Sequence, residues 1–151
     1  MNKATSLQER KQLGDMLVPA VPLMNCPIAT SLGVLGRKWT ILIIRDIGMR
    51  KVQRFSELLR SIHGLTPRIL SMRLKELEKE GLIKRIEERN SPRLVRWELT
   101  EKGIDTLPIL MDFVAFGSKW YADKVFEDQT PRTLQEVFPQ WNAEVISQRN
   151  A

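Results

Sequence analysis

The chain has 151 residues, of which 42% are hydrophobic and 28% charged, enough for one folded domain with a sizeable core. No apolar run approaches the roughly 18 residues that a membrane span needs, and no apolar segment follows a basic head at the start, so neither a membrane anchor nor a signal peptide is expected. The single cysteine excludes an internal disulfide and favours a reducing, cytoplasmic location.

The net charge of +6 is unevenly distributed along the chain. Residues 37–96 carry 16 Lys and Arg against 7 Asp and Glu, a net +9, whereas the rest carries 8 against 11, a net −3. A basic surface confined to one module is typical of nucleic-acid binding. A membrane-surface protein would instead show a basic amphipathic helix with exposed aromatic residues, and none is evident.

The first 23 residues are of mixed composition. A short helix is expected over Leu7 to Leu17, and Pro19 and Pro22 end it. We expect a flexible N-terminal arm over residues 1–23. The sequence leaves open whether this arm is simply disordered or swaps onto a second copy of the chain.

The most apolar part of the chain is residues 27–48. A first helix is expected to open at Pro27 and to end before Gly36, which interrupts the pattern. A second helix is expected over Lys38 to Asp46, and a basic loop follows it. One face of the first helix carries Ile28, Leu32 and Leu35. The residues expected to be buried in and just after the second helix are Trp39, Leu42, Ile43 and Ile47.

A helix-turn-helix is indicated over residues 56–81. A short amphipathic helix with Ser56 as its N-cap leads into a turn at residues 63–65 that contains glycine. The second helix has Thr66 as its N-cap, Pro67 in the first helical position and Gly81 at the left-handed position that closes it.

This second helix has one apolar and one basic face. Leu70, Leu74 and Leu77 recur at helical spacing, which predicts that they are buried. The opposite face carries three cations, a hydroxyl and a thioether but no acid, as expected of a surface that binds a polyanion. The residues of that face are Arg68, Ser71, Met72, Lys75 and Lys79.

A β-hairpin is expected directly after this helix. Its strands are predicted over Leu82 to Glu88 and Leu94 to Leu99, where Val95, Trp97 and Leu99 alternate with more polar residues. An arginine stands on each side of its tip, so the hairpin has the features of a wing. The predicted fold is therefore mainly α with a small β-hairpin (α+β), a winged helix-turn-helix with flanking dimerisation helices.

Thr100 is expected to cap a long final helix that Pro108 kinks. Its apolar positions cover more than about 100° of the helix surface, more than one small domain can bury. This favours a dimer interface with residues 28–36 of a second copy, and an intrachain core helix is the alternative. The predicted interface residues are Ile28, Leu32, Leu35, Leu107, Met111, Val114 and Ser118.

One more short helix is expected over Thr133 to Phe138. The predicted division of the chain is an N-terminal arm at 1–23, a DNA-binding and dimerisation domain at 24–127, and a C-terminal extension at 128–151.

Together these segments resemble the HxlR-type winged-helix transcriptional regulators, relatives of the MarR group. The resemblance spans about residues 24–120, although Leu94 precedes Val95 where the family commonly has an Arg-Val pair. It implies a homodimeric, cytoplasmic regulator that binds operator DNA. The stretches that carry it are Cys26 to Ile28, Gly36 to Arg45, Arg54 to Leu58, Thr66 to Leu77, Glu80 to Ile83 and Trp97 to Gly103.

The resemblance also draws attention to Cys26, because a cysteine at the matching position senses oxidants or electrophiles in some members. Cys26 precedes Pro27 at a helix N-terminus, where the partial positive charge of the helix favours a thiolate. A redox switch is therefore one interpretation of Cys26, and an inert, small apolar residue is the other.

Catalysis is not expected, since the chain has one histidine, one cysteine and one tyrosine. The sequence shows no cluster with metal-ligand spacing and no glycine-rich phosphate loop, so neither a metal nor a cofactor is expected. A winged-helix module that binds proteins or RNA remains an alternative. The basic, acid-free helix face argues against a protein partner, and aromatic residues confined to apolar stripes argue against single-stranded RNA.

We therefore expect sequence-specific binding to double-stranded operator DNA by a homodimer, with any small-molecule effector unknown. The second helix of the pair would enter a major groove, and the wing would reach the neighbouring minor groove or its phosphates. The predicted DNA-binding residues are Thr66, Arg68, Ser71, Met72, Lys75 and Lys79 on the helix, Arg54 in the preceding loop, and Arg89, Asn90 and Arg93 on the wing. Further candidates for backbone contacts are Arg50, Lys51 and Lys84.

Overall fold

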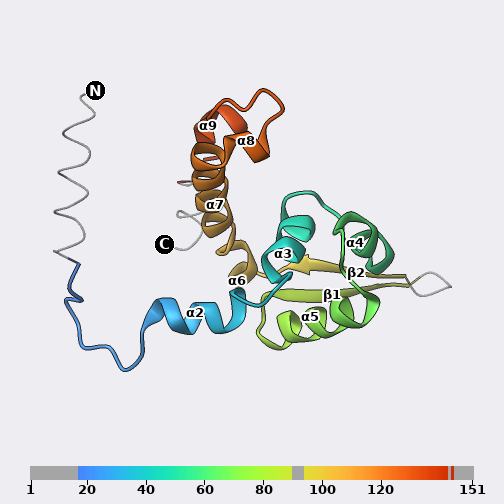
Figure 1. Cartoon of the computed structure of the whole chain (residues 1–151). Coiled ribbons are helices and arrows are strands. Elements are labelled where there is room, and N and C mark those ends of the chain that lie inside the picture. Colours follow the sequence, from blue (N-terminus) through green and yellow to red (C-terminus); the bar gives the residue numbers. More distant parts are fainter. Residues whose placement is uncertain (1–16, 90–93, 143, 145–151) are drawn as a thin grey trace, which may run out of the picture.

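The computed structural model describes residues 17–89, 94–142 and 144. These residues form helices around one two-stranded antiparallel sheet (Figure 1). The elements are α2 (Pro27–Leu35), α3 (Thr40–Gly48), α4 (Phe55–Ser61), α5 (Pro67–Lys79), β1 (Ile83–Glu88), β2 (Leu94–Leu99), α6 (Glu101–Ile104), α7 (Leu107–Trp120), α8 (Ala122–Val125) and α9 (Leu134–Val137). The helix predicted over Leu7 to Leu17 falls almost entirely outside the described residues. Within them, no helix is long and apolar enough to cross a membrane.

The hydrophobic core lies where α3, α4, α5 and the hairpin meet (Figure 1). The three leucines predicted to face inward on α5 are buried, with Leu70 fully covered. Each such side chain contributes about 1.5–3 kcal/mol through its removal from water. The core residues are Ile43, Ile44, Ile47, Leu58, Ile62, Leu65, Leu70, Leu74, Leu77, Leu82, Ile83 and Leu110.

Helix α2 has the predicted bounds, but α3 begins two residues later than expected. Trp39 is the N-cap of α3 and has a left-handed backbone, with φ of 79°, so regular helix starts at Thr40. Leu42, predicted to be buried, is 36% exposed because Ile43, Ile44 and Ile47 occupy the face of α3 that enters the core. Trp39 itself is half-buried.

The helix-turn-helix consists of α4, a tight turn and α5. Helix α4 begins at Phe55 with Arg54 as its N-cap, so the prediction of Ser56 as the cap is wrong. The extended backbone of Arg54 changes directly to helix, and no side chain caps this end. In the turn, Gly64 has φ of +85°, and a Cβ there would lie 3.2 Å from Cη2 of Trp39. The turn therefore needs glycine for both its backbone conformation and its packing.

Both ends of α5 agree with the predictions. The Oγ1 atom of Thr66 accepts a hydrogen bond from the backbone N–H of Ile69 at 3.3 Å, and Pro67 occupies the first turn. Gly81 follows the C-cap residue and has φ of +72°, the left-handed conformation that closes a helix.

The hairpin is antiparallel, with a register that runs from Ile83 opposite Leu99 to Glu88 opposite Leu94. Strand β1 begins one residue later than predicted, and β2 has the predicted bounds. The backbone N–H of Trp97 donates to the carbonyl oxygen of Gln53 at 2.9 Å, which attaches the hairpin to the segment before α4.

The long final helix predicted after Thr100 is two helices. Thr100 caps α6, where its Oγ1 accepts from the N–H of Gly103 at 3.1 Å, and α7 starts anew at Leu107. Pro108 lies in the first turn of α7, where its missing N–H is tolerated. The proline therefore starts a second helix instead of kinking one continuous helix.

The inner side of α7 is covered by its own chain. Met111 is 4% exposed and Ser118 is 3% exposed, so the prediction that these two side chains face a partner is corrected. Leu107 packs against the same intrachain core, and Val114 is half-buried. The reason is that α3 and α9 both pack on α7.

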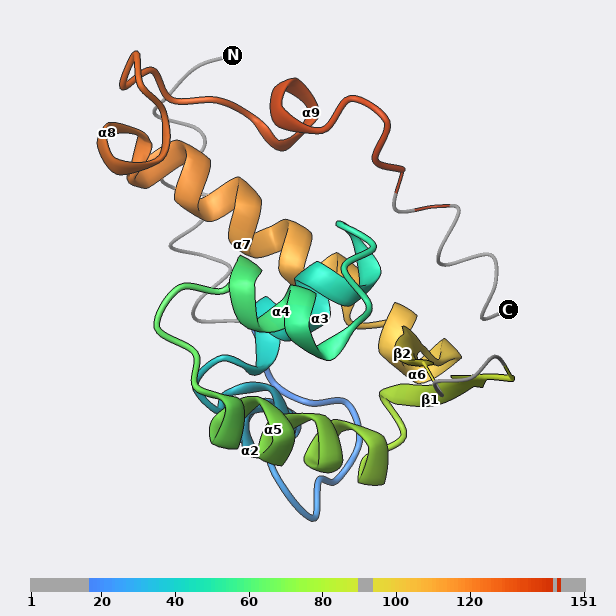
Figure 2. The same ribbon diagram turned by 90° about the vertical axis from the view of Figure 1, so that its right-hand side faces the viewer.

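The C-terminal extension returns along α7. Helix α9 confirms the short helix predicted over Thr133 to Phe138, and a capping box between Thr133 and Glu136 fixes its start. Figure 2 shows α7 running between α3 and the chain segment that carries α9.

Candidate nucleic-acid interface

The outward face of α5 carries unpaired positive charge. Arg68, Lys75 and Lys79 are exposed, and no ion pair to them is found in the part of the chain that the structure describes. Met72 is 44% exposed between them, and Ser71 is half-buried. Three cations on one acid-free helix face can bind successive phosphates or the acceptor atoms of bases.

Glu76, an acid on the flank of this face, is neutralised by two arginines. Glu76 forms ion pairs with Arg37 at 2.7 Å and with Arg73 at 2.9 Å. Arg73 also donates its Nε hydrogen to the carbonyl oxygen of Lys38 at 3.0 Å. These contacts tie α5 to the link between α2 and α3. Sequence reasoning missed Arg37 and Arg73, although the Arg73–Glu76 spacing of three residues is a recognisable helix pair.

The hairpin carries cations that are mostly paired with acids. Lys84 and Arg96 both pair with Glu98, at 3.8 and 3.2 Å, and Arg96 also lies 3.8 Å from Glu88. Arg54, a predicted DNA contact, lies 3.7 Å from Glu88. Exposed pairs of this kind are weak, so these cations can exchange partners. Arg89 is exposed, whereas Asn90 and Arg93 lie outside the described residues.

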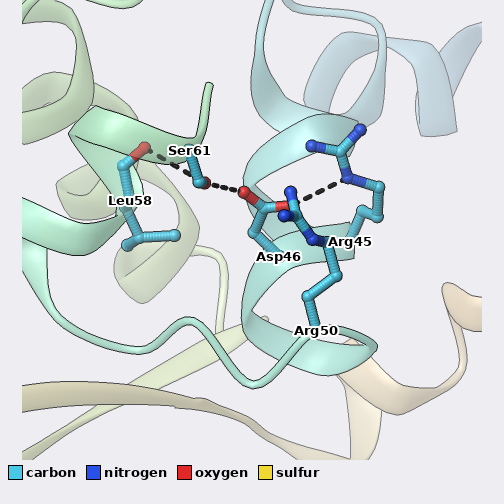
Figure 3. A network of polar contacts seen from close by, with 5 residues as sticks. All are labelled: Arg45, Asp46, Arg50, Leu58 and Ser61. Atoms are coloured by element: carbon cyan, nitrogen blue, oxygen red, sulfur yellow. Dashed lines mark hydrogen bonds and ion pairs between the residues drawn. The ribbon is translucent and has the colours of Figure 1, made fainter. Parts of the chain in front are cut away.

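A buried carboxylate connects α3 to α4 (Figure 3). Asp46 is completely buried, and its Oδ1 accepts hydrogen bonds from Nε of Arg45 at 2.7 Å and Nη1 of Arg50 at 3.2 Å. Its Oδ2 accepts a hydrogen bond from the hydroxyl of Ser61, the last residue of α4. Arg50, a candidate for DNA backbone contact, is thus held by Asp46 with its side chain 51% exposed.

Burial alone would raise the pKa of the Asp46 carboxyl. The hydrogen bonds from Arg45 and Ser61 and the charges of Arg45 and Arg50 outweigh burial, so this pKa lies below its ordinary value. Sequence reasoning did not single out Asp46. A signal was available, because an acid within the apolar stretch Ile41 to Ile47 falls on the same helix face as Ile43 and needs a cationic partner.

Cys26 is exposed and is the N-cap residue of α2, where its side chain makes no capping hydrogen bond. No group of three or more His, Cys, Asp or Glu side chains in the described ranges is placed to hold a metal ion.

A helix-turn-helix followed by an antiparallel hairpin, with exposed cations on its second helix, defines a winged helix-turn-helix DNA-binding fold. The family model of the HxlR-like helix-turn-helix proteins matches residues 34–125, and the chain belongs to this family. The HTH-type transcriptional regulator BH0655 of Halalkalibacterium halodurans is 38% identical over 97 residues, covering 64% of this chain and 86% of the relative.

Solved structures agree with this assignment. A MarR-family transcriptional regulator from Porphyromonas gingivalis superposes with a TM-score of 0.55 at 32% identity, covering 66% of this chain and 96% of the other. The reduced form of the regulator YodB from Bacillus subtilis gives a TM-score of 0.55 at 29% identity, covering 64% and 95%. YodB has also been solved after diamide treatment. The family and these relatives are transcriptional regulators, and the chain is a transcriptional regulator rather than an enzyme.

Proposed function

We propose that the protein binds double-stranded operator DNA in the cytoplasm as a homodimer, with α5 of each copy in a major groove. The observation that carries this proposal is the outward face of α5, where Arg68, Lys75 and Lys79 are exposed without acidic partners in the described part of the chain. Thr66 also stands exposed at the start of this helix. A recognition helix contacts base edges mainly through its first turns, which assigns base reading to Arg68, Ser71, Met72 and Lys75. Lys79, the last residue of α5, is assigned to contact with the phosphate backbone.

The wing and the preceding loop complete the proposed contact with DNA. Arg89, Asn90 and Arg93 would reach the minor groove or its phosphates, and Arg54 would contact the backbone after exchanging its pairing with Glu88. Such contacts position the protein without reading sequence.

Unburied apolar surface supports the homodimer. Helix α2 has no buried residue, and Ile28 and Leu32 are 72% and 56% exposed. On α7, Phe113 and Phe116 are 58% and 56% exposed. Figure 1 shows α2 projecting away from the helices around the sheet. Apolar side chains of a helix that the described residues leave exposed are typical of an interface with another chain. The proposed dimer surface therefore consists of Ile28 and Leu32 of α2 with Ile109, Phe113, Phe116 and Trp120 of α7, flanked by the half-buried Leu35 and Val114.

Selection of bound fragments from a pool of random duplex DNA tests both parts of the proposal. We expect enriched fragments with two inverted half-sites whose centres lie about 10 base pairs or a multiple of that apart, as a two-fold dimer requires. Enrichment of a single half-site would contradict the dimer, and no enrichment over non-specific binding would contradict operator recognition. A preference for RNA over the same duplex sequences would favour the alternative function.

The proposed function includes a response to oxidants or electrophiles through Cys26. Cys26 is exposed and opens α2, which belongs to the proposed dimer surface, so its modification would act directly on the arrangement of the two copies. The relative YodB, solved in reduced and diamide-treated forms, supports this part of the proposal.

A further inference from the structure

A cavity of about 570 Å³ lies between α3, α7 and the C-terminal segment that carries α9. Its walls are largely apolar. The main contributors are Met49 after α3, Phe113 and Val114 on α7, and Val137 and Phe138 at the end of α9. This volume is within the range of about 300–1,000 Å³ that is usual for pockets that bind small molecules.

One charged side chain, Arg45 of α3, is found among the described residues that line this cavity. Its Nε is bonded to the buried Asp46 at 2.7 Å, which fixes the orientation of the guanidinium group. Figure 3 shows the two terminal nitrogens of Arg45 directed away from Asp46. No hydrogen bond or ion pair to these two nitrogens is found in the described part of the chain, and the side chain is 34% exposed.

The charge near the cavity is positive. Asp46 is one carboxylate shared between two arginines, Arg45 and Arg50. One positive charge at this site is therefore left without a counter-charge from Asp46, and it stands beside an apolar wall. Two parallel N–H donors on a fixed guanidinium match the two oxygens of a carboxylate.

We propose that this cavity binds a small amphipathic monoanion, a carboxylate attached to an apolar chain or ring. The carboxylate would take both terminal nitrogens of Arg45, and the apolar part would pack against Phe113, Val114 and Phe138. The ligand enters as a free small molecule in solution.

The C-terminal extension supplies part of this site. Val137 and Phe138 lie beyond residues 34–125, the range that the family model matches. Helix α9 is held on its side of the cavity by packing on α7, and its capping box fixes where the helix begins. The cavity wall is thus a property of this chain's own extension.

Binding of octanoate and of its uncharged analogue octanamide to the full-length protein, measured by isothermal titration calorimetry, tests the proposal. We expect octanoate to bind at least about tenfold more tightly than octanamide, since a charge-assisted pair of hydrogen bonds distinguishes them. Arg45→Gln should remove this preference and leave octanamide binding unchanged. Arg45→Lys, which keeps the charge but not the paired donors, should give an intermediate affinity and provides a second variant if Arg45→Gln does not fold.

Arg50→Gln is the matched control, because Arg50 bonds to the same oxygen of Asp46 without lining the cavity. It removes the excess positive charge but keeps the paired donors of Arg45, so the preference for octanoate should fall less than in Arg45→Gln. Val137→Trp should weaken both ligands by filling the space between α9 and α7. Equal affinities for octanoate and octanamide, or unchanged octanoate binding by Arg45→Gln, would overturn the proposal. It would also be overturned if octanoate failed to bind and Val137→Trp instead turned dimers into monomers in sedimentation, because the cavity would then be a contact between copies.

Discussion

The hydroxyl of Ser61 donates a hydrogen bond to the buried carboxylate of Asp46 and so joins the last residue of α4 to α3 (Figure 3). The same carboxylate holds Arg50, in the loop that leads to α4. This polar contact therefore adds to the apolar packing of Leu58 against the core in joining the first helix of the helix-turn-helix to α3. A buried network of this kind stabilises the fold only when each of its members is bonded.

Asp46→Asn tests this network. The variant loses the charge-assisted hydrogen bonds from Arg45 and Arg50, and we expect the free energy of unfolding to fall by about 1.5–3 kcal/mol at neutral pH. Because the pKa of Asp46 is lowered on folding, its contribution is complete above the ordinary value of 3.8 and is lost as the pH falls through the lower folded value. Urea denaturation at a series of pH values should show the two proteins converging in acid. A constant difference at all pH values would contradict this role of the Asp46 charge.

The N-cap of α5 gives a second test. Thr66→Ala removes the acceptor for the N–H of Ile69, and the free energy of unfolding should fall by about 1 kcal/mol. Thr66→Ser keeps the oxygen atom and should have nearly the stability of the parent in the same urea titration. Equal losses in the two variants would mean that the cap makes no contribution.

The two ends of the outward face of α5 should respond differently to substitution. Arg68→Ala should weaken operator binding by about 1–3 kcal/mol and relax the preference at one base pair, because it removes a base contact. Lys79→Ala should weaken all sequences alike and lower the slope of log affinity against log salt by about one unit. Fluorescence anisotropy with operator and scrambled duplexes across a salt series measures both effects. Parent-like affinity in both variants would refute the assignment of this face.

The proposed dimer surface can be tested without disturbing the intrachain core. Phe113→Glu changes a side chain that is 58% exposed, whereas the same change at the buried Met111 would unfold the chain. Sedimentation should show folded monomers for Phe113→Glu, because a charge in a closed interface is costly. Leu94→Glu, an equally drastic change at a position 36% exposed on β2, is the control and should remain dimeric. A dimeric Phe113→Glu would place the interface elsewhere.

Cys26 can be examined by oxidation. Treatment with diamide should link two copies through a disulfide between their Cys26 residues and change the affinity for operator, whereas Cys26→Ser should show neither effect. Non-reducing gel electrophoresis and operator binding before and after treatment provide the measurements. Unchanged operator affinity of the treated parent protein would identify Cys26 as an inert residue and leave the DNA-binding proposal unaffected.

The boundaries of α5 and the hairpin strand β2 could be predicted from sequence because their signals are local. Thr66, Pro67 and Gly81 each act through their own backbone geometry or the nearest turn, and the structure uses them as predicted. The three leucines of α5 follow from helical period alone. The basic outward face is the complement of this buried face, so the same periodicity predicted it.

Other features needed the tertiary structure, because they depend on which segments pack together. Periodicity showed that the helix after Thr100 is widely apolar, but it did not show that the side with Met111 and Ser118 is covered by the same chain. Trp39, whose backbone is left-handed, places its ring against the distant turn at Gly64.

The contacts of Asp46 separate most directly what local sequence determines from what tertiary packing determines. The sequence determined that an acid lies on an apolar helix face, and elementary electrostatics requires a cationic or hydrogen-bonding partner for it. Arg45 and Arg50 are near in sequence, but Ser61 is 15 residues away and meets Asp46 because α4 packs on α3. Local sequence thus determined the helices and the basic face. The packing of distant segments decided which charges are neutralised, which remain on the surface, and where the C-terminal extension forms part of the wall of a cavity beside Arg45.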